Sequence, residues 1–159
     1  MKETGGEAPL RYRYLSEQHL PAVMTLETQA YPDPWTHGMF RQEIDNGASH
    51  FFLALRENRL VGYGGFWLVT DEAHLTKLTV AEQQRRTRLG TRIMLHLLRE
   101  AALAGAKMML LEVRESNTPA RCLYEKLGFA RVGLRKGYYA RSNEAAVVMT
   151  RRVPMAGAR

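Results

Sequence analysis

The chain has 159 residues, of which 45% are hydrophobic, and 23 Lys and Arg against 16 Asp and Glu give it a net charge of +7. This length suits one domain with its own core, and no run of about 18 uncharged apolar residues offers a membrane span. The start MKETGGEAPL lacks an apolar signal core and Cys122 has no second cysteine to pair with, so we expect a cytoplasmic protein with no membrane partner. The positive charge indicates an acidic partner, which could be a nucleotide cofactor, RNA, a ribosomal surface or an acidic peptide.

The N-terminal third reads as a strand followed by two helices. Residues 11–15 favour a short strand, and Ser16 is a candidate N-cap for an amphipathic helix that ends before Pro32. Thr36 is a candidate N-cap for a second, shorter helix. We expect that helix to bury Met39, Phe40 and Ile44 and to leave Arg41 and Glu43 in solvent.

The remainder alternates strands and helices. We expect strands at 50–55, 60–70, 73–80, 107–114, 130–138 and 145–152, a helix from Leu89 to a stop at Gly105, and another from a cap at Asn117 or Thr118 to Gly128. The helix between the strands 73–80 and 107–114 is what a parallel crossover requires. No linker divides the chain, so we expect one domain over 10–152 between flexible ends at 1–9 and 153–159.

The turn after the third central strand, residues 81–88, favours phosphate binding. It is basic and opens a helix, where unsatisfied N–H groups and the positive end of the helix dipole meet. A solvated basic loop is the plain alternative.

This turn resembles the acetyl-CoA pyrophosphate loop of the GNAT N-acetyltransferases. The family pattern Q/R-x-x-G-x-G/A aligns with Arg85, Arg86, Thr87, Arg88, Leu89 and Gly90. Arg88 stands where the family has its first glycine, so its side chain either obstructs the cradle or donates to the pyrophosphate. The resemblance also implies cofactor contacts at Thr91 and, through backbone groups of the preceding strand, at Leu78, Thr79 and Val80.

Three further segments resemble the RimI-like branch of that family. They are LLEVRESNTPARCLYEKLGF at 110–129, PDPWT at 32–36 and GYY at 137–139. The resemblance implies an α/β fold with a mixed, splayed sheet of about seven strands and helices on both faces. It also implies acetyl-CoA as co-substrate and, as acceptor, the N-terminal alanine of a small-subunit ribosomal protein.

Site residues follow from the same resemblance. Glu112 takes the position of the general base and Tyr124 that of the acid that protonates the coenzyme A sulfur. From the residues alone, Glu112 would more simply form an ion pair with Arg114 or Lys107, and Tyr124 would pack in the core. Asn117 is expected to cap its helix and to contact the pantetheine arm.

The resemblance implies acceptor contacts at three aromatic residues, namely Trp35, Tyr138 and Tyr139. Closing the edge of the sheet is an equal alternative for Tyr138 and Tyr139. Glu144 represents the acidic residue that the family usually carries before its last strand. The five histidines lack the short spacing of a zinc site, so no metal is expected. Cys122 reads as a buried helix residue, and Met108 and Met109 as core strand.

The sequence therefore predicts an enzyme that transfers acetyl directly from acetyl-CoA to a protein N-terminal α-amine. Transfer to a lysine side chain or to a small-molecule amine is the alternative within the family. A catalytically weak acetyl-CoA binding module and a basic RNA or ribosome binder are the rivals from other classes, and nucleic-acid binding is not expected as the main function because an RNA-reading aromatic strand pattern is missing.

Overall fold

The computed structural model describes residues 8–85, 87–139 and 143–154. The chain forms two compact units, one within Met1–Gly65 and Lys77–Ile93 and the other within Phe66–Thr76 and Met94–Arg159. Three elements, β3 (Arg59–Val69), β4 (Glu72–Val80) and α3 (Leu89–Leu103), contribute residues to both units. The single domain expected over 10–152 stays a prediction.

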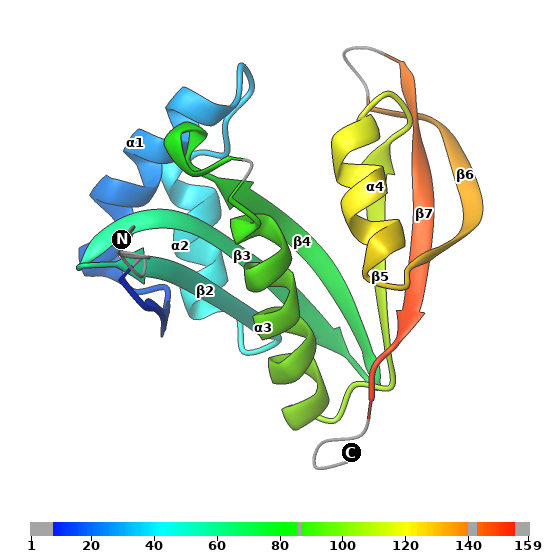
Figure 1. Cartoon of the computed structure of the whole chain (residues 1–159), viewed down its shortest axis with the longest axis horizontal. Coiled ribbons are helices and arrows are strands. Elements are labelled where there is room, and N and C mark those ends of the chain that lie inside the picture. Colours follow the sequence, from blue (N-terminus) through cyan, green and yellow to red (C-terminus); the bar gives the residue numbers. More distant parts are fainter. Residues whose placement is uncertain (1–7, 86, 140–142, 155–159) are drawn as a thin grey trace, which may run out of the picture. The chain divides into compact units, whose positions relative to one another are not determined.

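The first unit contains most of the N-terminal elements (Figure 1). They are β1 (Leu10–Tyr14), the 3-10 helix η1 (Glu17–His19), α1 (Leu20–Ala30), α2 (His37–Asp45), β2 (Ser49–Arg56), the 3-10 helix η2 (Glu82–Gln84) and the first turn of α3 (Leu89–Leu103).

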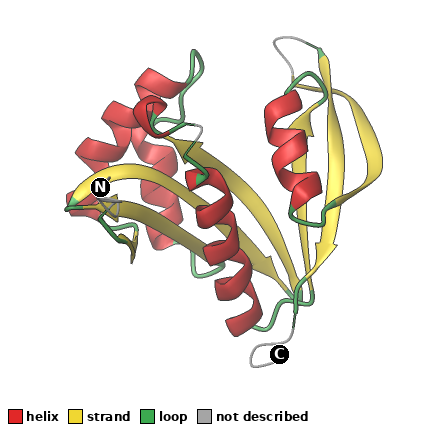
Figure 2. Cartoon of the chain, viewed as in Figure 1, coloured by secondary structure: helices red, strands yellow, loops and turns green. Residues whose placement is uncertain are grey.

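The second unit contains the rest of α3 and the C-terminal elements. They are β5 (Met108–Arg114), α4 (Thr118–Lys126), β6 (Ala130–Tyr139) and β7 (Glu144–Arg152). Figure 2 shows α4 as the helix that lies beside these strands.

The strands are hydrogen-bonded in the order β1-β2-β3-β4-β5-β7-β6. β4 and β5 run parallel, with Glu72 opposite Met108, whereas β5 pairs with β7 and β7 with β6 in antiparallel fashion. The expected mixed sheet of about seven strands is thus confirmed, as is the parallel crossover through α3.

Local sequence signals account for several element ends. The Thr36 side chain accepts a hydrogen bond from Met39 N at 3.2 Å and caps α2 as expected. Gly105, at φ +93°, follows the C-terminal end of α3 in the left-handed conformation that glycine adopts without steric cost. Glu57 and Asn58 both have positive φ in the two-residue turn between β2 and β3, the geometry that joins a tight hairpin.

The core of the first unit lies between α1, α2 and the strands β2 and β3. It includes Leu20 and Val23 of α1, Phe40 of α2, Leu53 of β2 and Tyr63 of β3, each at most 1% exposed. Burying a side chain of the Leu or Phe class contributes about 1.5–3 kcal/mol, so this cluster stabilises the fold of the unit.

Three expectations in this region were wrong in detail. Ser16 precedes the 3-10 helix η1 rather than α1, and its hydroxyl pairs with His19 Nδ1 at 2.8 Å. On α2, Met39 is 41% exposed and Glu43 is buried at 5%, the reverse of the expected orientation. The helix turns Phe40 inward, and Glu43, three residues later, lies on that same face.

Candidate functional site

The turn between β4 and α3 has the local geometry of an anion site. Arg92 N donates to the carbonyl of Arg88 at 3.0 Å, which opens α3, so the N–H groups of Leu89, Gly90 and Thr91 lie in a first turn that helical carbonyls do not reach. The side chains of Arg85, Thr87 and Arg88 are exposed. Arg86 lies outside the described residues.

Arg88 has φ +63°, the left-handed conformation that favours glycine. Gly90 lies inside α3 and has no such requirement. Of the two glycine positions in the family pattern, only position 88 therefore has a backbone conformation that favours glycine, and this chain carries arginine there.

The end of β4 holds the other residues expected near the cofactor. Thr79 is buried, and its Oγ1 lies 2.8 Å from the hydroxyl of Tyr31, which also donates to the carbonyl of Leu78 at 3.2 Å. Val80 is half-buried just before the turn. Tyr31 thus fixes the backbone of β4 immediately before the basic turn.

Trp35 is anchored in the segment that joins α1 to α2. Its backbone N–H donates to Glu27 Oε2 at 2.8 Å, and its ring packs on Phe40 with the centroids 5.1 Å apart. The Lys77 ammonium lies 4.5 Å from the Trp35 centroid and 4.3 Å from that of Tyr31.

A buried polar cluster under this segment was missed by the sequence reasoning. Glu27 is 0% exposed, accepts a hydrogen bond from the Tyr63 hydroxyl at 2.5 Å and pairs with Lys77 at 2.8 Å. Burial lowers the pKa of Lys77, although the Glu27 carboxylate opposes this shift. Burial and the bond to Glu27 raise the pKa of Tyr63.

A signal for this cluster existed in the sequence. Glu27 stands four residues after Val23 and seven after Leu20, on the apolar face of its helix. Lys77 is two residues before Thr79, so both side chains point to the same face of their strand. A charged residue at an inward position on each element marks both as buried partners.

In the second unit, Glu112 lies in the middle of β5 with 19% of its side chain exposed. Its Oε1 is 3.6 Å from Nη1 of Arg135 on β6. Of the two cations named in the simpler alternative, Arg114 pairs with Glu144 at 3.4 Å and Lys107 pairs with Asp71 at 3.8 Å.

Tyr124 lies on α4, buried at 6%, with its ring edge-on to Phe129 at 5.8 Å between centroids. The helix is fixed at both ends. Asn117 accepts from Ala120 N at 3.2 Å as the expected N-cap, and Arg151 of β7 donates to the carbonyl of Leu127 at 2.7 Å. Tyr124 therefore has a rigid support.

The two adjacent tyrosines of β6 lie edge to face, 5.0 Å apart. Tyr138 is 45% exposed, while Tyr139 is half-buried beneath the guanidinium of Arg114. Burial raises the pKa of Tyr139, and the charge of Arg114 opposes this. Of this pair, Tyr138 has the more accessible aromatic ring.

The remaining sequence-based expectations concern the burial of Cys122, Met108 and Met109, metal ligands and membrane spans. Cys122 is exposed rather than buried, Met109 is buried as expected and Met108 only half-buried. Over residues 8–85, 87–139 and 143–154, no three His, Cys, Asp or Glu side chains gather as metal ligands would. Within the same ranges, no helix has the length and apolar character to span a membrane.

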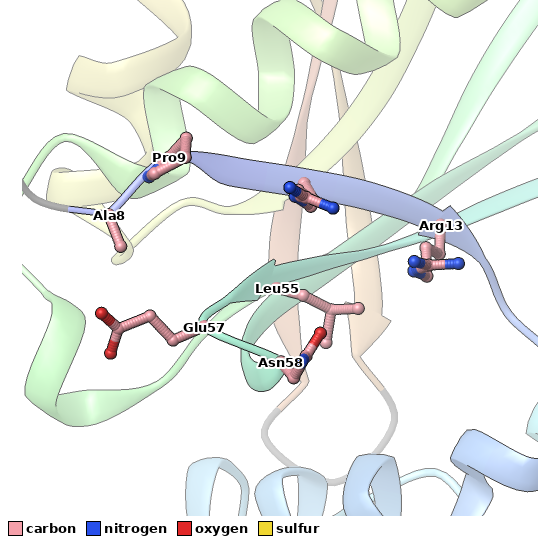
Figure 3. A pocket seen from close by; sticks show the side chains of 7 residues that line it. Ala8, Pro9, Arg13, Leu55, Glu57 and Asn58 are labelled. Atoms are coloured by element: carbon pink, nitrogen blue, oxygen red, sulfur yellow. The ribbon is translucent and has the colours of Figure 1, made fainter.

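A separate pocket of about 250 Å³ lies at the start of β1 in the first unit (Figure 3). Its lining combines the exposed arginines of β1 with the β2–β3 turn and consists of Ala8, Pro9, Arg11, Arg13, Leu55, Glu57 and Asn58. None of these described residues belongs to the site expected from the sequence.

Comparisons with known proteins bear on the whole chain. The sequence profile of the acetyltransferase (GNAT) family matches residues 20–129. The [ribosomal protein bS18]-alanine N-acetyltransferase of Salmonella typhimurium is 33% identical over 144 residues, which cover 89% of this chain and 96% of that protein. The protein of the same name from Haemophilus influenzae is 35% identical over 128 residues, covering 78% and 86%.

Solved structures agree with these sequences. The crystal structure of the ribosomal-protein-S18-alanine N-acetyltransferase from Escherichia coli superimposes with a TM-score of 0.84 at 30% identity, and the match covers 94% of this chain and 97% of that one.

Proposed function

Because the chain belongs to the acetyltransferase (GNAT) family, we propose that it transfers an acetyl group to the N-terminal α-amine of a protein, with the N-terminal alanine of a small-subunit ribosomal protein as acceptor. The observation that carries this proposal is the extent of the similarity, 33% identity over 89% of the chain to an enzyme named for that reaction. A ribosomal acceptor would place the protein in the cytoplasm.

The basic turn fits acetyl-CoA as the co-substrate. Its positive φ at Arg88, the first-turn N–H groups of α3 and the exposed guanidinium groups are features that suit a pyrophosphate. We assign phosphate binding to Arg85, Thr87, Arg88, Leu89, Gly90 and Thr91, with Arg86 as a further candidate, and pantetheine binding to Leu78, Thr79, Val80 and Asn117. When bound, acetyl-CoA supplies the activated acetyl thioester.

Two residues of the second unit are assigned the proton transfers. Glu112 takes a proton from the incoming amine, which exposes the lone pair that attacks the acetyl carbonyl. Its carboxylate is partly exposed, so it is reachable, and Arg135 balances its charge. Tyr124 donates its phenolic proton to the departing thiolate, a role for which its buried, supported ring is suited.

The acceptor is assigned to aromatic side chains. Tyr138 and Tyr139 on β6 and Trp35 before α2 supply rigid, amphipathic surfaces of the kind that recognise peptides at low entropic cost. The side chain of Glu144, the acidic residue before the last strand, already pairs with Arg114 and accepts from Ser116 N at 2.8 Å. We therefore do not assign acceptor binding to Glu144.

Mass spectrometry of a peptide panel with varied first residues, incubated with acetyl-CoA and the protein, tests the proposal. We expect one added acetyl group at the α-amine of peptides that begin with alanine. Modification of small amines alone would move the protein to the alternative within its family, and binding of acetyl-CoA without any transfer would favour the binding module.

A further inference from the structure

The Glu27 cluster, formed by Glu27, Tyr31, Trp35, Tyr63 and Lys77, lies entirely within the first unit. At its centre the fully buried carboxylate of Glu27 faces three donors: the Tyr63 hydroxyl on Oε1, and the Trp35 N–H and Lys77 ammonium on Oε2. The charges of Glu27 and Lys77 balance each other inside the fold.

This cluster holds the α1–α2 segment, residues 31–36, at two points. At one end the hydroxyl of Tyr31 donates to the Leu78 carbonyl of β4. Near the other end the backbone of Trp35 is bound to Glu27 on α1. Lys77, on β4, extends its ammonium to both rings, at 4.3 Å from Tyr31 and 4.5 Å from Trp35.

A buried ion pair is by itself a weak source of net stability. Desolvation of two charges offsets much of their attraction, and apolar residues of similar volume often serve a core at least as well. A buried, hydrogen-bonded ion pair that binds a loop backbone instead fixes one conformation of that loop, because few other geometries satisfy all of its donors.

We propose that Glu27 is a positioning residue for the acceptor peptide, acting through the backbone of Trp35. Its carboxylate holds residues 31–36 in the conformation that presents Trp35 to the peptide, and Lys77 supplies the balancing charge. This inference rests on the proposed function, in which Trp35 contacts the acceptor. Loss of the carboxylate acceptor should weaken peptide binding while the chemical step and acetyl-CoA binding are maintained.

Two double variants that leave the net charge unchanged test whether a hydrogen-bond acceptor at position 27 is needed. In Glu27→Gln with Lys77→Met, the amide oxygen can still accept from Trp35 N–H, and the amide N–H can donate to the Tyr63 hydroxyl. In Glu27→Leu with Lys77→Met, the volume is similar but the acceptor is gone. Glu17→Gln, which removes an exposed carboxylate that pairs with Arg41, is the control.

Steady-state kinetics with an alanine-initiated peptide gives the first readout. We expect the Leu/Met variant to raise the KM for peptide by at least about tenfold, with kcat and acetyl-CoA affinity changed by less than about threefold. The Gln/Met variant and Glu17→Gln should stay within about threefold of the wild type in all three quantities. A peptide KM that is unchanged in a folded Leu/Met variant would overturn the inference.

Amide exchange gives a second readout that needs no activity. The chain has two tryptophans, so ¹⁵N-tryptophan labelling yields two backbone signals, and Trp67→Phe assigns them. We expect the Trp35 amide of the wild type to exchange at least about 100-fold more slowly than an unprotected amide, and this protection to persist in the Gln/Met variant. Exchange of the wild-type Trp35 amide at the unprotected rate overturns the positioning role even if the Leu/Met variant fails to fold. Protection of Trp35 in a protein that acetylates no peptide would instead overturn the proposed function.

Discussion

The guanidinium of Arg114 lies over the ring of Tyr139, with Cζ 3.9 Å from the ring centroid, and its Nη1 lies 3.4 Å from Glu144 Oε2. One side chain at the end of β5 thereby contacts the last residue of β6 and the first of β7. Two residues before Arg114 on the same strand, Glu112 pairs with Arg135 of β6 at 3.6 Å.

The first prediction concerns Glu144. Hydrogen bonds from Ser116, and then the contact with Arg114, hold the pKa of Glu144 below its ordinary value of 4.5. The unfolded chain then binds more protons near that pH, so this stabilisation is present above pH 4.5 and is lost as the pH falls through the lower folded pKa. We expect Glu144→Gln to be less stable than the wild type at pH 7, and the difference in stability to be smaller at pH 3.

Denaturant unfolding of both proteins at the two pH values measures that difference, with Glu125→Gln, an exposed carboxylate on α4, as the control. A gap of the same size at both pH values would show that the hydrogen bonds do not depend on the charge of Glu144.

The second prediction concerns Arg88. The left-handed conformation costs a residue other than glycine about 1–2 kcal/mol, whereas glycine costs about 0.5–1 kcal/mol in backbone entropy. Arg88→Gly should therefore keep the free energy of unfolding or raise it by up to about 1.5 kcal/mol. Arg85→Gly, at the ordinary φ of −65°, should lower it.

Calorimetry with acetyl-CoA then tests the guanidinium of Arg88. We expect the wild type to bind and Arg88→Gly to bind more weakly, since an exposed arginine can donate to the pyrophosphate. Binding by the glycine variant alone would mean that the side chain obstructs the cradle.

The third prediction concerns Glu112 as base. Glu112→Gln should lower turnover by about 10²–10⁴-fold, the usual range for a positioned proton transfer, and the loss should shrink as rising pH deprotonates the free amine. The turnover of both proteins is measured as coenzyme A release at several pH values, with both substrates at saturating concentrations. Glu115→Gln, an exposed carboxylate just beyond β5, is the matched control. A loss that is independent of pH would assign Glu112 a role other than general base.

The fourth prediction concerns Tyr124 as acid. Tyr124→Phe removes only the hydroxyl and retains the ring that packs on Phe129. Turnover should fall while the affinity for acetyl-CoA stays near that of the wild type, which is the pattern of an interaction made in the transition state. High pH should not restore the rate. Turnover that is unaffected would leave Tyr124 as a packing residue.

The sequence predicted the order of helices and strands because caps and periodicity are local. Thr36 and Asn117 cap the starts of α2 and α4, and Gly105 follows the end of α3, so each acts within a few residues of its own helix. Which residues far apart in the chain pair with each other was not predicted. Glu27 and Lys77 are 50 positions apart in the chain, and Glu112 meets Arg135 through the pairing of β5 and β6 with β7.

Orientation on short helices was equally hard to predict. Met39 and Phe40 are both apolar neighbours, and the burial of Glu43 rather than Met39 depends on tertiary partners that the periodicity of nine residues does not specify. The exposure of Cys122 on α4 has the same origin. Residue roles at the site came from resemblance to a family, since isolated residues such as Glu112 and Tyr124 carry no pattern of their own.

The central claim is that the acceptor is a protein N-terminal α-amine, and a paired-peptide assay tests it most directly. One peptide begins with a free alanine and lacks lysine, and the other has the same sequence with a blocked N-terminus and one internal lysine. Initial rates of acetylation by the wild type are measured by mass spectrometry at equal concentrations with saturating acetyl-CoA. We predict that the free alanine peptide is acetylated at least about tenfold faster, since its α-amine titrates near 8 and needs less assistance than a lysine side chain. An equal or faster rate on the blocked peptide would contradict the claim.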